Sequence, residues 1–437
     1  MNFPESLKYL FNLGNEVTAM KLGLENITKL LDALGNPQKK FLKVQVAGTN
    51  GKGSTCAFLD AICVSANIKT GLYTSPHLIS ITERIKISGQ EISEKDFAAH
   101  ATVIRRVSEK LVGVGEFETV PTFFEQVTAI ALSVFAAEKI ELAILETGLG
   151  GRFDATTAAK AEIAAITPID YDHQDILGET LTEIAGEKAA IIRADTRVFV
   201  APQKREAENV IHGKCREVGV TPVWIIPNVN LIENLGGGLL YLSFKTNETN
   251  YKVDLRMPGK HQWTNAALAI YIAEGLRDFN FKIPKDSIEI GLEIAEHKGR
   301  LEFWNRLNAP SILFDGAHNV AGAEALREYL DEFIKQPITM IFGAMRDKNL
   351  TEIAEIIFPK AENLIFTVPD NPRSLETLEL FNFVPVTHEN KVFETQTVAE
   401  AIEKAREISS PNHLILITGS LYLVGEAQKI LKSECEI

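Results

Sequence analysis

Short apolar runs alternate with helix-like segments along most of the chain, a pattern typical of a parallel sheet covered by helices. Residues 41–48 (FLKVQVAG) predict a buried strand that ends in a glycine turn, and the periodicity of residues 54–67 predicts a helix directly after it. Two more predicted strands, at 141–148 and 161–169, each run into a polar loop. The alternation near residues 239–257 predicts an antiparallel hairpin at the side of this first domain.

The strand–helix pattern restarts after about Glu296. Helix-like segments separate five strand candidates: SILFDGA (311–317), ITMIFGA (338–344), NLIFTV (363–368), KVFET (391–395) and HLILITGS (413–420). We therefore expect an α/β protein with a large, mostly parallel domain over 1–296 and a smaller Rossmann-like α/β domain over 297–437. The boundary should lie in the charged segment 295–300, and a cleft between two such domains is a favoured ligand site.

Composition narrows the class of protein. The chain of 437 residues is 45% hydrophobic and 24% charged, as is ordinary for soluble globular proteins. It has no apolar run long enough to span a membrane and no basic, then apolar, N-terminal signal, so we expect a cytoplasmic protein. A net charge of −13 argues against nucleic-acid binding. The four cysteines lack metal-site spacing and are interpreted as reduced thiols: Cys56, Cys63, Cys215 and Cys435.

Residues 48–55 (GTNGKGST) join the first predicted strand to its helix, as a phosphate-binding loop requires. Glycines let backbone N–H groups turn toward an anion, and the helix N-terminus favours negative charge. We expect Lys52 to contact the β- and γ-phosphates and Ser54 to offer its hydroxyl to Mg²⁺. Gly53 separates these two residues, unlike in a standard Walker A motif, and the alternative is a glycine turn with an incidental lysine. The predicted nucleotide contacts are Thr49, Asn50, Gly51, Lys52, Gly53, Ser54 and Thr55.

Ten segments, in order along the chain, resemble the folylpolyglutamate synthase/dihydrofolate synthase family of the Mur ligase superfamily. They are LGNPQK (34–39), AGTNGKGST (47–55), GLYTSPHL (71–78), ERIKISG (83–89), TFFE (122–125), ETGLGGRFDAT (146–156), GKHQWTNAALA (259–269), GRLE (299–302), DGAHN (315–319) and TGSLYLVGE (418–426). Only 47 residues precede Gly48, too few for the nucleotide-sugar-binding domain of murein peptide ligases, which favours the folate branch. One departure is segment 20–27, where the family commonly has an arginine near Asn26.

The resemblance implies an N-terminal P-loop ATPase domain and an ATP-dependent, Mg²⁺-requiring ligase. Such an enzyme phosphorylates the carboxylate of dihydropteroate or a reduced folate and joins the acyl phosphate to L-glutamate. Activity on one acceptor or on both stays open from the sequence, and we favour both. K⁺ is a further cofactor that the resemblance allows, and we expect a monomer.

The resemblance also assigns side chains outside the loop. It implies that Glu146 and His173 bind the metal together with Ser54. Glu146 ends a predicted strand at the ligand edge of the sheet, whereas the residues alone do not favour His173 over Asp170 or Asp172. The implied ATP contacts are Asn265, Arg300 and Asp315. The implied substrate contacts are Ser75, Pro76, His77, Phe123, Phe124, Asp154 and Ser420.

The two phenylalanines and the segment DGAHN each have a structural alternative. Phe123 and Phe124 could stack on a flat heteroaromatic ring or simply pack in the core. The segment DGAHN (315–319), which contains the candidate catalytic residue His318, could be a turn built from Asp, Gly and Asn. His318 and Ser420 are the candidates for the glutamate site.

Lys188 lies in a segment, 181–192, that should be helical. Counting from Lys188, positions −7, −4, −3, +3 and +4 are apolar: Leu181, Ile184, Ala185, Ile191 and Ile192. Burial would lower the pKa of the ammonium, and a neutral amine can react with CO₂ to give a carbamate. The alternative is a buried stem whose charged end reaches water or pairs with Glu187 or Glu183. The family resemblance favours the carbamate, because the matching lysine is carbamylated there.

Overall fold

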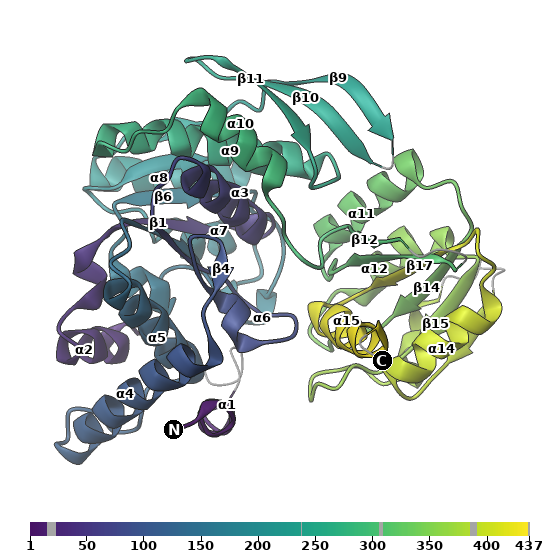
Figure 1. The fold of residues 1–437 in the computed structure, drawn as a ribbon, viewed down its shortest axis with the longest axis horizontal. Helices are drawn as coiled ribbons and strands as arrows, with labels where there is room; N and C mark the ends of the chain where they lie inside the picture. The colour runs from purple at the N-terminus through teal and green to yellow at the C-terminus, as the bar shows by residue number, and fades with distance from the viewer. Residues whose placement is uncertain (15–22, 237, 306–308, 385–390, 436–437) are drawn as a thin grey trace.

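The protein consists of two α/β units that lie side by side, joined by a linker and flanked by a small third sheet (Figure 1). The structure is a computed structural model that describes residues 1–14, 23–236, 238–305, 309–384 and 391–435. Residues 20–22 of the segment in which the sequence departs from the family therefore lie outside the described residues, as does the side chain of Cys435. The other three cysteines are buried and unpaired.

The N-terminal unit is built on an eight-stranded sheet of order β4-β3-β2-β5-β1-β6-β7-β8. Its strands are β1 (Leu42–Ala47), β2 (Thr70–Tyr73), β3 (Ile85–Ile87), β4 (Gln90–Glu91), β5 (Leu142–Glu146), β6 (Ile163–Ile166), β7 (Arg197–Val200) and β8 (Val223–Trp224). Neighbouring strands are parallel except for β3 and β4 at one edge. The predicted strands at 41–48, 141–148 and 161–169 are therefore confirmed.

Helices cover both faces of this sheet (Figure 1). They are α1 (Phe3–Phe11), α2 (Glu25–Ala33), α3 (Lys52–Ser65), α4 (Glu94–Gly113), α5 (Phe123–Ala137), α6 (Gln174–Leu177), α7 (Leu181–Ala189), α8 (Arg205–Val218), α9 (His261–Gly275) and α10 (Lys285–Ile294). Alternate residues of β5 enter different cores: Leu142 and Ile144 pack with α3 and α9, whereas Ala143 and Leu145 pack with α5. Burial on both faces explains why the parallel strands read as continuous apolar runs.

A three-stranded antiparallel sheet borders this unit. Its strands are β9 (Val229–Gly236), β10 (Leu239–Lys245) and β11 (Asn250–Leu255). The predicted hairpin corresponds to β10 and β11, which pair antiparallel. The sequence did not predict β9, because its apolar residues Leu231, Ile232 and Leu235 are exposed and do not follow a one-face pattern.

The C-terminal unit has a six-stranded sheet of order β12-β13-β17-β14-β15-β16. Its strands are β12 (Glu302–Trp304), β13 (Ser311–Asp315), β14 (Ile338–Phe342), β15 (Asn363–Phe366), β16 (Lys391–Glu394) and β17 (Leu414–Thr418), and its helices are α11 (Val320–Phe333), α12 (Leu350–Ile357), α13 (Thr377–Leu380), α14 (Val398–Ile408) and α15 (Leu421–Cys435). All five predicted strands are present and parallel. The unpredicted β12 is an antiparallel edge strand of three residues, too short to show a period.

The strand register brings the loops of each sheet to one edge. In the first sheet, β1 pairs with both β5 and β6, so that Val46 lies beside Glu146 and Ala47 beside Ile166. In the second sheet, Thr418 lies beside Asp315 and Phe342. Ligands of open α/β sheets bind outside such carboxyl edges. Within the described residues, no helix combines the length and the apolar character that crossing a membrane would need.

Candidate active site

The phosphate loop lies where the sequence places it, between the end of β1 at Ala47 and the start of α3 at Lys52. Gly51 has φ +87°, and a Cβ there would stand 2.2 Å from the Asn265 Oδ1 atom. A Cβ on Gly48 would stand 1.9 Å from the Thr167 Oγ1 atom. Both glycines are therefore needed for close approach of other groups to the loop. Lys52 Nζ bends back over the loop and donates to the carbonyl oxygens of Gly48 and Thr49 at 3.1 and 3.0 Å.

The Ser54 hydroxyl is held by a chain of side chains from α9 and the linker. Gln262 Nε2 donates to Ser54 Oγ at 3.2 Å, and Asn265 in turn donates to Gln262. His297 Nδ1 lies 3.1 Å from the same hydroxyl oxygen. Burial, followed by the charges of Arg300 and Lys86, lowers the pKa of His297 to about 3, so its imidazole is neutral. A neutral imidazole can accept the hydroxyl proton and leave an oxygen lone pair for a cation.

Glu146 borders the same loop from the end of β5. Its Oε2 atom accepts from the backbone N–H of Ser75 at 3.0 Å, and its Oε1 atom lies 3.3 Å from where a Cβ on Gly53 would be. The side chain is buried. A carboxylate and the Ser54 hydroxyl beside a phosphate loop are hard oxygen donors of the kind that Mg²⁺ prefers, so these residues fit the implied metal.

His173 lies farther along the cleft, at the start of α6, with φ +50°. Its Nε2 atom is 3.8 Å from an oxygen of Asp172, and its Nδ1 atom is 4.0 Å from an oxygen of Asp347. Burial lowers the pKa of His173 to about 4, against the opposing effect of Asp172. Among the described residues, no group of three or more His, Cys, Asp or Glu side chains has a metal-binding arrangement. Glu146 and His173 line two different cavities, which share Ser75, Pro76 and Leu421 as walls.

Lys188 is buried in α7, with 4% of its surface exposed. Its Nζ atom donates to the Gly48 carbonyl oxygen at 3.0 Å. Burial, followed by the positive charge of Lys52, lowers the pKa of Lys188 to about 7. Neither predicted acidic partner reaches it, because Glu187 pairs with Arg152 at 2.7 Å and Glu183 accepts from Thr180.

The apolar neighbours predicted for this lysine need one correction. The helix α7 ends at Ala189, so Ile191 and Ile192 lie beyond it, although both are buried. The short helix still presents Lys188 on the same side as Ile184, toward the phosphate loop.

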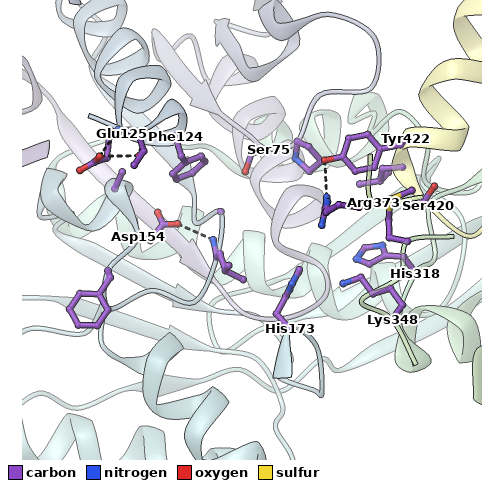
Figure 2. Close-up of a pocket in the computed structure, with 18 of the residues that line it drawn as sticks. Ser75, Phe124, Glu125, Asp154, His173, His318, Lys348, Arg373, Ser420 and Tyr422 are labelled. Atoms are coloured by element: carbon purple, nitrogen blue, oxygen red, sulfur yellow. Dashed lines mark hydrogen bonds between the residues drawn. The ribbon is translucent and has the colours of Figure 1, made fainter. Parts of the chain in front are cut away.

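A cavity of about 170 Å³ lies between the two units (Figure 2). The N-terminal unit contributes Ser75 and Asp154 from loops and Phe124 from the start of α5, and His173 lies at the junction of the two units. The residues from the C-terminal unit include His318, Met345, Lys348, Arg373, Ser420 and Tyr422. The sequence-derived candidates on both sides therefore face one space, with apolar groups on one side and cations on the other.

The two phenylalanines have different environments. Phe124 lines the cavity, and its ring lies against Gly148, where a Cβ would stand only 2.5 Å away. Phe123 is buried in the core, stacked on Phe11 at 5.8 Å with the Arg84 guanidinium 5.4 Å from its ring. It is not among the residues that line the cavity, so the packing alternative describes Phe123 and not its neighbour.

Two predicted ligand contacts, His77 and Asp154, are engaged with the protein itself. His77 Nδ1 accepts from Arg84 Nε at 2.8 Å, and burial lowers the pKa of His77 to about 3. Ser75 and Pro76 line the cavity but His77 does not. The carboxylate of Asp154 accepts from the backbone N–H groups of Leu149 and Thr156 at 2.9 and 3.0 Å, although the residue also lines the cavity.

The implied ATP contacts of the C-terminal side meet at the linker. Arg300 lines the second cavity, of about 110 Å³, together with Glu146 and Gly53, and donates to the Gly316 carbonyl oxygen at 3.2 Å. Asp315 is buried and accepts from the backbone N–H groups of Leu301 and Ala317. Burial raises the pKa of Asp315. These two contacts are those of a side chain that stabilises a turn, which is the structural alternative for the segment DGAHN.

The sequence did not predict two basic side chains that line the cavity, Lys348 and Arg373. Lys348 follows β14 and contacts Asp172 at 2.7 Å. Arg373 follows β15, donates to the Tyr422 hydroxyl at 3.2 Å and has a buried Nε atom without a hydrogen-bond partner among the described residues (Figure 2). The signal was available, because both loops leave the carboxyl edge of the second sheet, as DGAHN does.

Known proteins match this chain over most of its length. Residues 46–273 match the Mur ligase middle domain, and residues 299–421 match the Mur ligase, glutamate ligase domain. The dihydrofolate synthase/folylpolyglutamate synthase of Bacillus subtilis is 35% identical over 94% of this chain and 96% of its own.

Two solved structures share the fold. The folylpolyglutamate synthase of Mycobacterium tuberculosis, complexed with ADP and AMPPCP, superposes with a TM-score of 0.87 and 29% identity over 98% of this chain and 99% of that one. The E. coli FolC protein in complex with DHPP and ADP gives a TM-score of 0.86 and 27% identity over 100% and 99% of the two chains.

Proposed function

Because this chain belongs to the dihydrofolate synthase/folylpolyglutamate synthase family of Mur ligases, ATP-dependent enzymes that join glutamate to a pteroate-type carboxylate, we propose that it accepts both dihydropteroate and reduced folates. The observation that carries this proposal is the cavity between the two units, which combines a flat aromatic wall at Phe124 with the cations Lys348 and Arg373. The Bacillus subtilis relative, which carries both activities in its name, supports a double acceptor range.

Two bond-forming steps account for this activity. An oxygen of the acceptor carboxylate attacks the γ-phosphorus of ATP, and ADP leaves. The neutral amino nitrogen of glutamate then attacks the acyl phosphate carbon, an N–C bond forms, and the C–O bond to phosphate breaks. Inorganic phosphate leaves with the oxygen it received, and the nitrogen gives up one proton, which the phosphate dianion can take. Water would hydrolyse the acyl phosphate, so enclosure between the two units protects it.

The roles of the phosphate-loop residues follow from their contacts. Backbone N–H groups at the start of α3 cradle the phosphates, and Lys52 needs only to swing from its own loop carbonyls to reach them. Ser54, Glu146 and His173 would hold Mg²⁺, which when bound neutralises phosphate charge. Asn265, packed on Gly51, together with Arg300 and Asp315 at the linker, would hold the rest of the nucleotide.

The acceptor and glutamate take opposite sides of the cavity in this proposal. Ser75, Pro76, Phe124 and Asp154 would contact the ring system and its arm. Glutamate would lie among the polar residues of the second unit: His318, Lys348, Arg373, Ser420 and Tyr422. A planar guanidinium and an ammonium are the groups that bind carboxylates best, which supports this assignment.

Lys188 is the proposed site of a carbamate. The neutral amine attacks CO₂, an N–C bond forms and a proton leaves, so the buried cation becomes an anion beside the phosphate loop. Its lowered pKa, and the absence of contact with either nearby glutamate, support this proposal. A requirement for K⁺, a monomeric state and a cytoplasmic location remain predictions from the sequence, as do the domain limits 1–296 and 297–437.

The test is one ligation assay with two acceptors. The purified chain is given ATP, Mg²⁺ and L-glutamate with either dihydropteroate or tetrahydrofolate, and ADP and the glutamylated products are measured. We expect ADP release that depends on both the acceptor and glutamate, with each acceptor. Product with only one acceptor would restrict the proposal to that activity, and product with neither, while ATP still binds, would overturn it.

A further inference from the structure

Asp172 stands at the meeting point of the two units, and no role assigned so far involves it. It lies in the loop between β6 and α6, and its side chain is only 9% exposed. One carboxylate oxygen contacts Lys348 Nζ at 2.7 Å. The other accepts from Asn319 Nδ2 at 3.0 Å and lies 3.7 Å from His318 Nε2. These three partners belong to the C-terminal unit, whereas the backbone N–H of His173 donates to the same carboxylate from its own loop at 2.9 Å. This one carboxylate therefore has contacts on both sides of the cleft.

Lys348 depends on this contact. Its side chain is 7% exposed, and the acidic groups within 4 Å of its ammonium are Asp172 and, at 3.4 Å, Asp347. A buried ammonium without an anionic partner is strongly disfavoured. Asp172 is the nearer of the two acidic groups, at 2.7 Å compared with 3.4 Å for Asp347, and is therefore the main anionic partner of this ammonium.

The geometry leaves Lys348 able to bind a substrate as well. An ammonium has three N–H donors; Asp172 accepts from one, and Asp347 lies 3.4 Å away as an ion-pair partner. Lys348 also lines the cavity beside His318 and Arg373. A donor is thus available to a carboxylate in the cavity while the contact with Asp172 fixes the position of the ammonium.

The same cluster reaches the phosphate loop. Asn319 Nδ2, which donates to Asp172, also donates to Asn50 Oδ1 at 3.0 Å. Asn319 Oδ1 accepts from the Gly322 N–H at 2.8 Å and so begins α11. Asp172 therefore links the lysine of the cavity to a residue of the loop that would hold ATP.

We propose that Asp172 is a positioning residue for the incoming amino acid: it holds Lys348 across the boundary between the two units so that Lys348 can receive a carboxylate of L-glutamate. The glutamate side of the cavity thus depends on contacts between the two units. This inference rests on the proposed function, because it takes glutamate as the occupant of the cationic side of the cavity.

The test is Asp172→Asn in the full chain, with Asp175→Asn as the matched control. Asp175 is an exposed carboxylate three positions along the same segment, so its substitution changes the net charge equally. The two oxygens of Asp172 accept from Lys348 and Asn319 separately. A carboxamide at position 172 replaces one of these oxygens by an NH₂ group, so a donor would face the donor of Lys348 or of Asn319. We expect the KM for L-glutamate to rise by roughly tenfold to a hundredfold, the range for loss of a charged hydrogen bond, while the Kd for ATP stays within about twofold of wild type. The control should leave both constants unchanged.

A double-mutant cycle separates positioning from folding. If Asp172 acts through Lys348, the substitution Asp172→Asn should raise the KM for glutamate in wild type but have little further effect in Lys348→Met. Equal effects in both backgrounds, or an unchanged KM in Asp172→Asn, would overturn the inference while leaving the ligase assignment intact. If Asp172→Asn does not fold, the same cycle is run with Asp172→Glu, which keeps the charge but displaces it. A wild-type chain that binds ATP but ligates no acceptor would overturn the proposed function, and this inference with it.

Discussion

Lys188→Ala is the perturbation that most directly tests the chemistry proposed beside the phosphate loop. In the wild-type protein the pKa of this amine is about 7, compared with 10.5 for an ordinary lysine. At pH 7 about half of the Lys188 amines are therefore neutral, against roughly one in three thousand for an unperturbed lysine. Only the neutral amine reacts with CO₂, so burial raises the reactive fraction by about three orders of magnitude at this pH.

The direction of the pH dependence follows from this pKa. The neutral fraction rises as the pH increases through about 7, so carbamate formation in bicarbonate buffer should rise over the same range. Incorporation of ¹³C-labelled bicarbonate, followed by NMR of the intact protein, measures it directly. Lys43 is the internal comparison, because it is equally buried at 4% exposure but its ammonium contacts the Glu162 carboxylate at 3.0 Å. Labelling should be lost in Lys188→Ala and kept when Lys43 is replaced.

Activity supplies the second measurement. We expect Lys188→Ala to lower the ligation rate on the order of a hundredfold to a thousandfold, as is typical when one group that stabilises developing charge is removed. The truncated side chain leaves space beside Gly48, so acetate or formate should restore part of the rate by supplying a carboxylate there. A folded Lys188→Ala protein with full activity unaided, or a wild-type protein that takes up no label, would refute the carbamate.

Three further predictions concern residues around the two cavities. Lys52→Ala should abolish turnover without lowering the melting temperature, because the hydrogen bonds of its ammonium to described residues go to two carbonyls of its own loop; near-normal ligation would contradict its phosphate role. Phe124→Leu should raise the KM for the pteroate acceptor about tenfold, whereas Phe123→Leu should lower the melting temperature and leave that KM unchanged. His297→Leu removes a hydrogen-bond partner of Ser54 and should raise the Mg²⁺ concentration needed for half-maximal rate, while His297→Asn, which can place an acceptor near the Nδ1 position, should not.

Periodicity predicted most of the fold because the parallel strands are buried on both faces. The continuous apolar run of residues 142–145 is explained by β5, whose alternate residues enter separate cores. The sequence did not predict two strands that lack such a continuous buried run. β9 exposes its apolar residues, and β12 has only three residues, too few to show any period.

The candidate site was predictable only where chemistry is local to one loop. The phosphate loop needs glycines, a lysine and a hydroxyl in sequence, so residues 48–55 carry their own signal. Lys348 and Arg373 carry only their place after a strand, a signal that they share with many lysines and arginines, and only the fold shows which of these face a cavity. The resemblance to a family added candidates such as Phe123 by adjacency in sequence, although successive residues at the start of α5 point in different directions.

The choice between Asp172 and His173 shows a second limit of prediction from the sequence. Both residues follow the same strand, and sequence reasoning could weigh them only as rival metal ligands. In the structure they contact each other but have different further partners: the Asp172 carboxylate accepts from the His173 backbone N–H and also contacts Lys348 and Asn319 across the cleft. His173 adopts a left-handed backbone at the start of α6. The carboxyl-edge rule predicts which residues gather at the edge of each sheet, but which residues of two sheets meet depends on how the linker sets one edge against the other. A contact that crosses that boundary therefore has no signal in either segment of the sequence, and only the structure shows it.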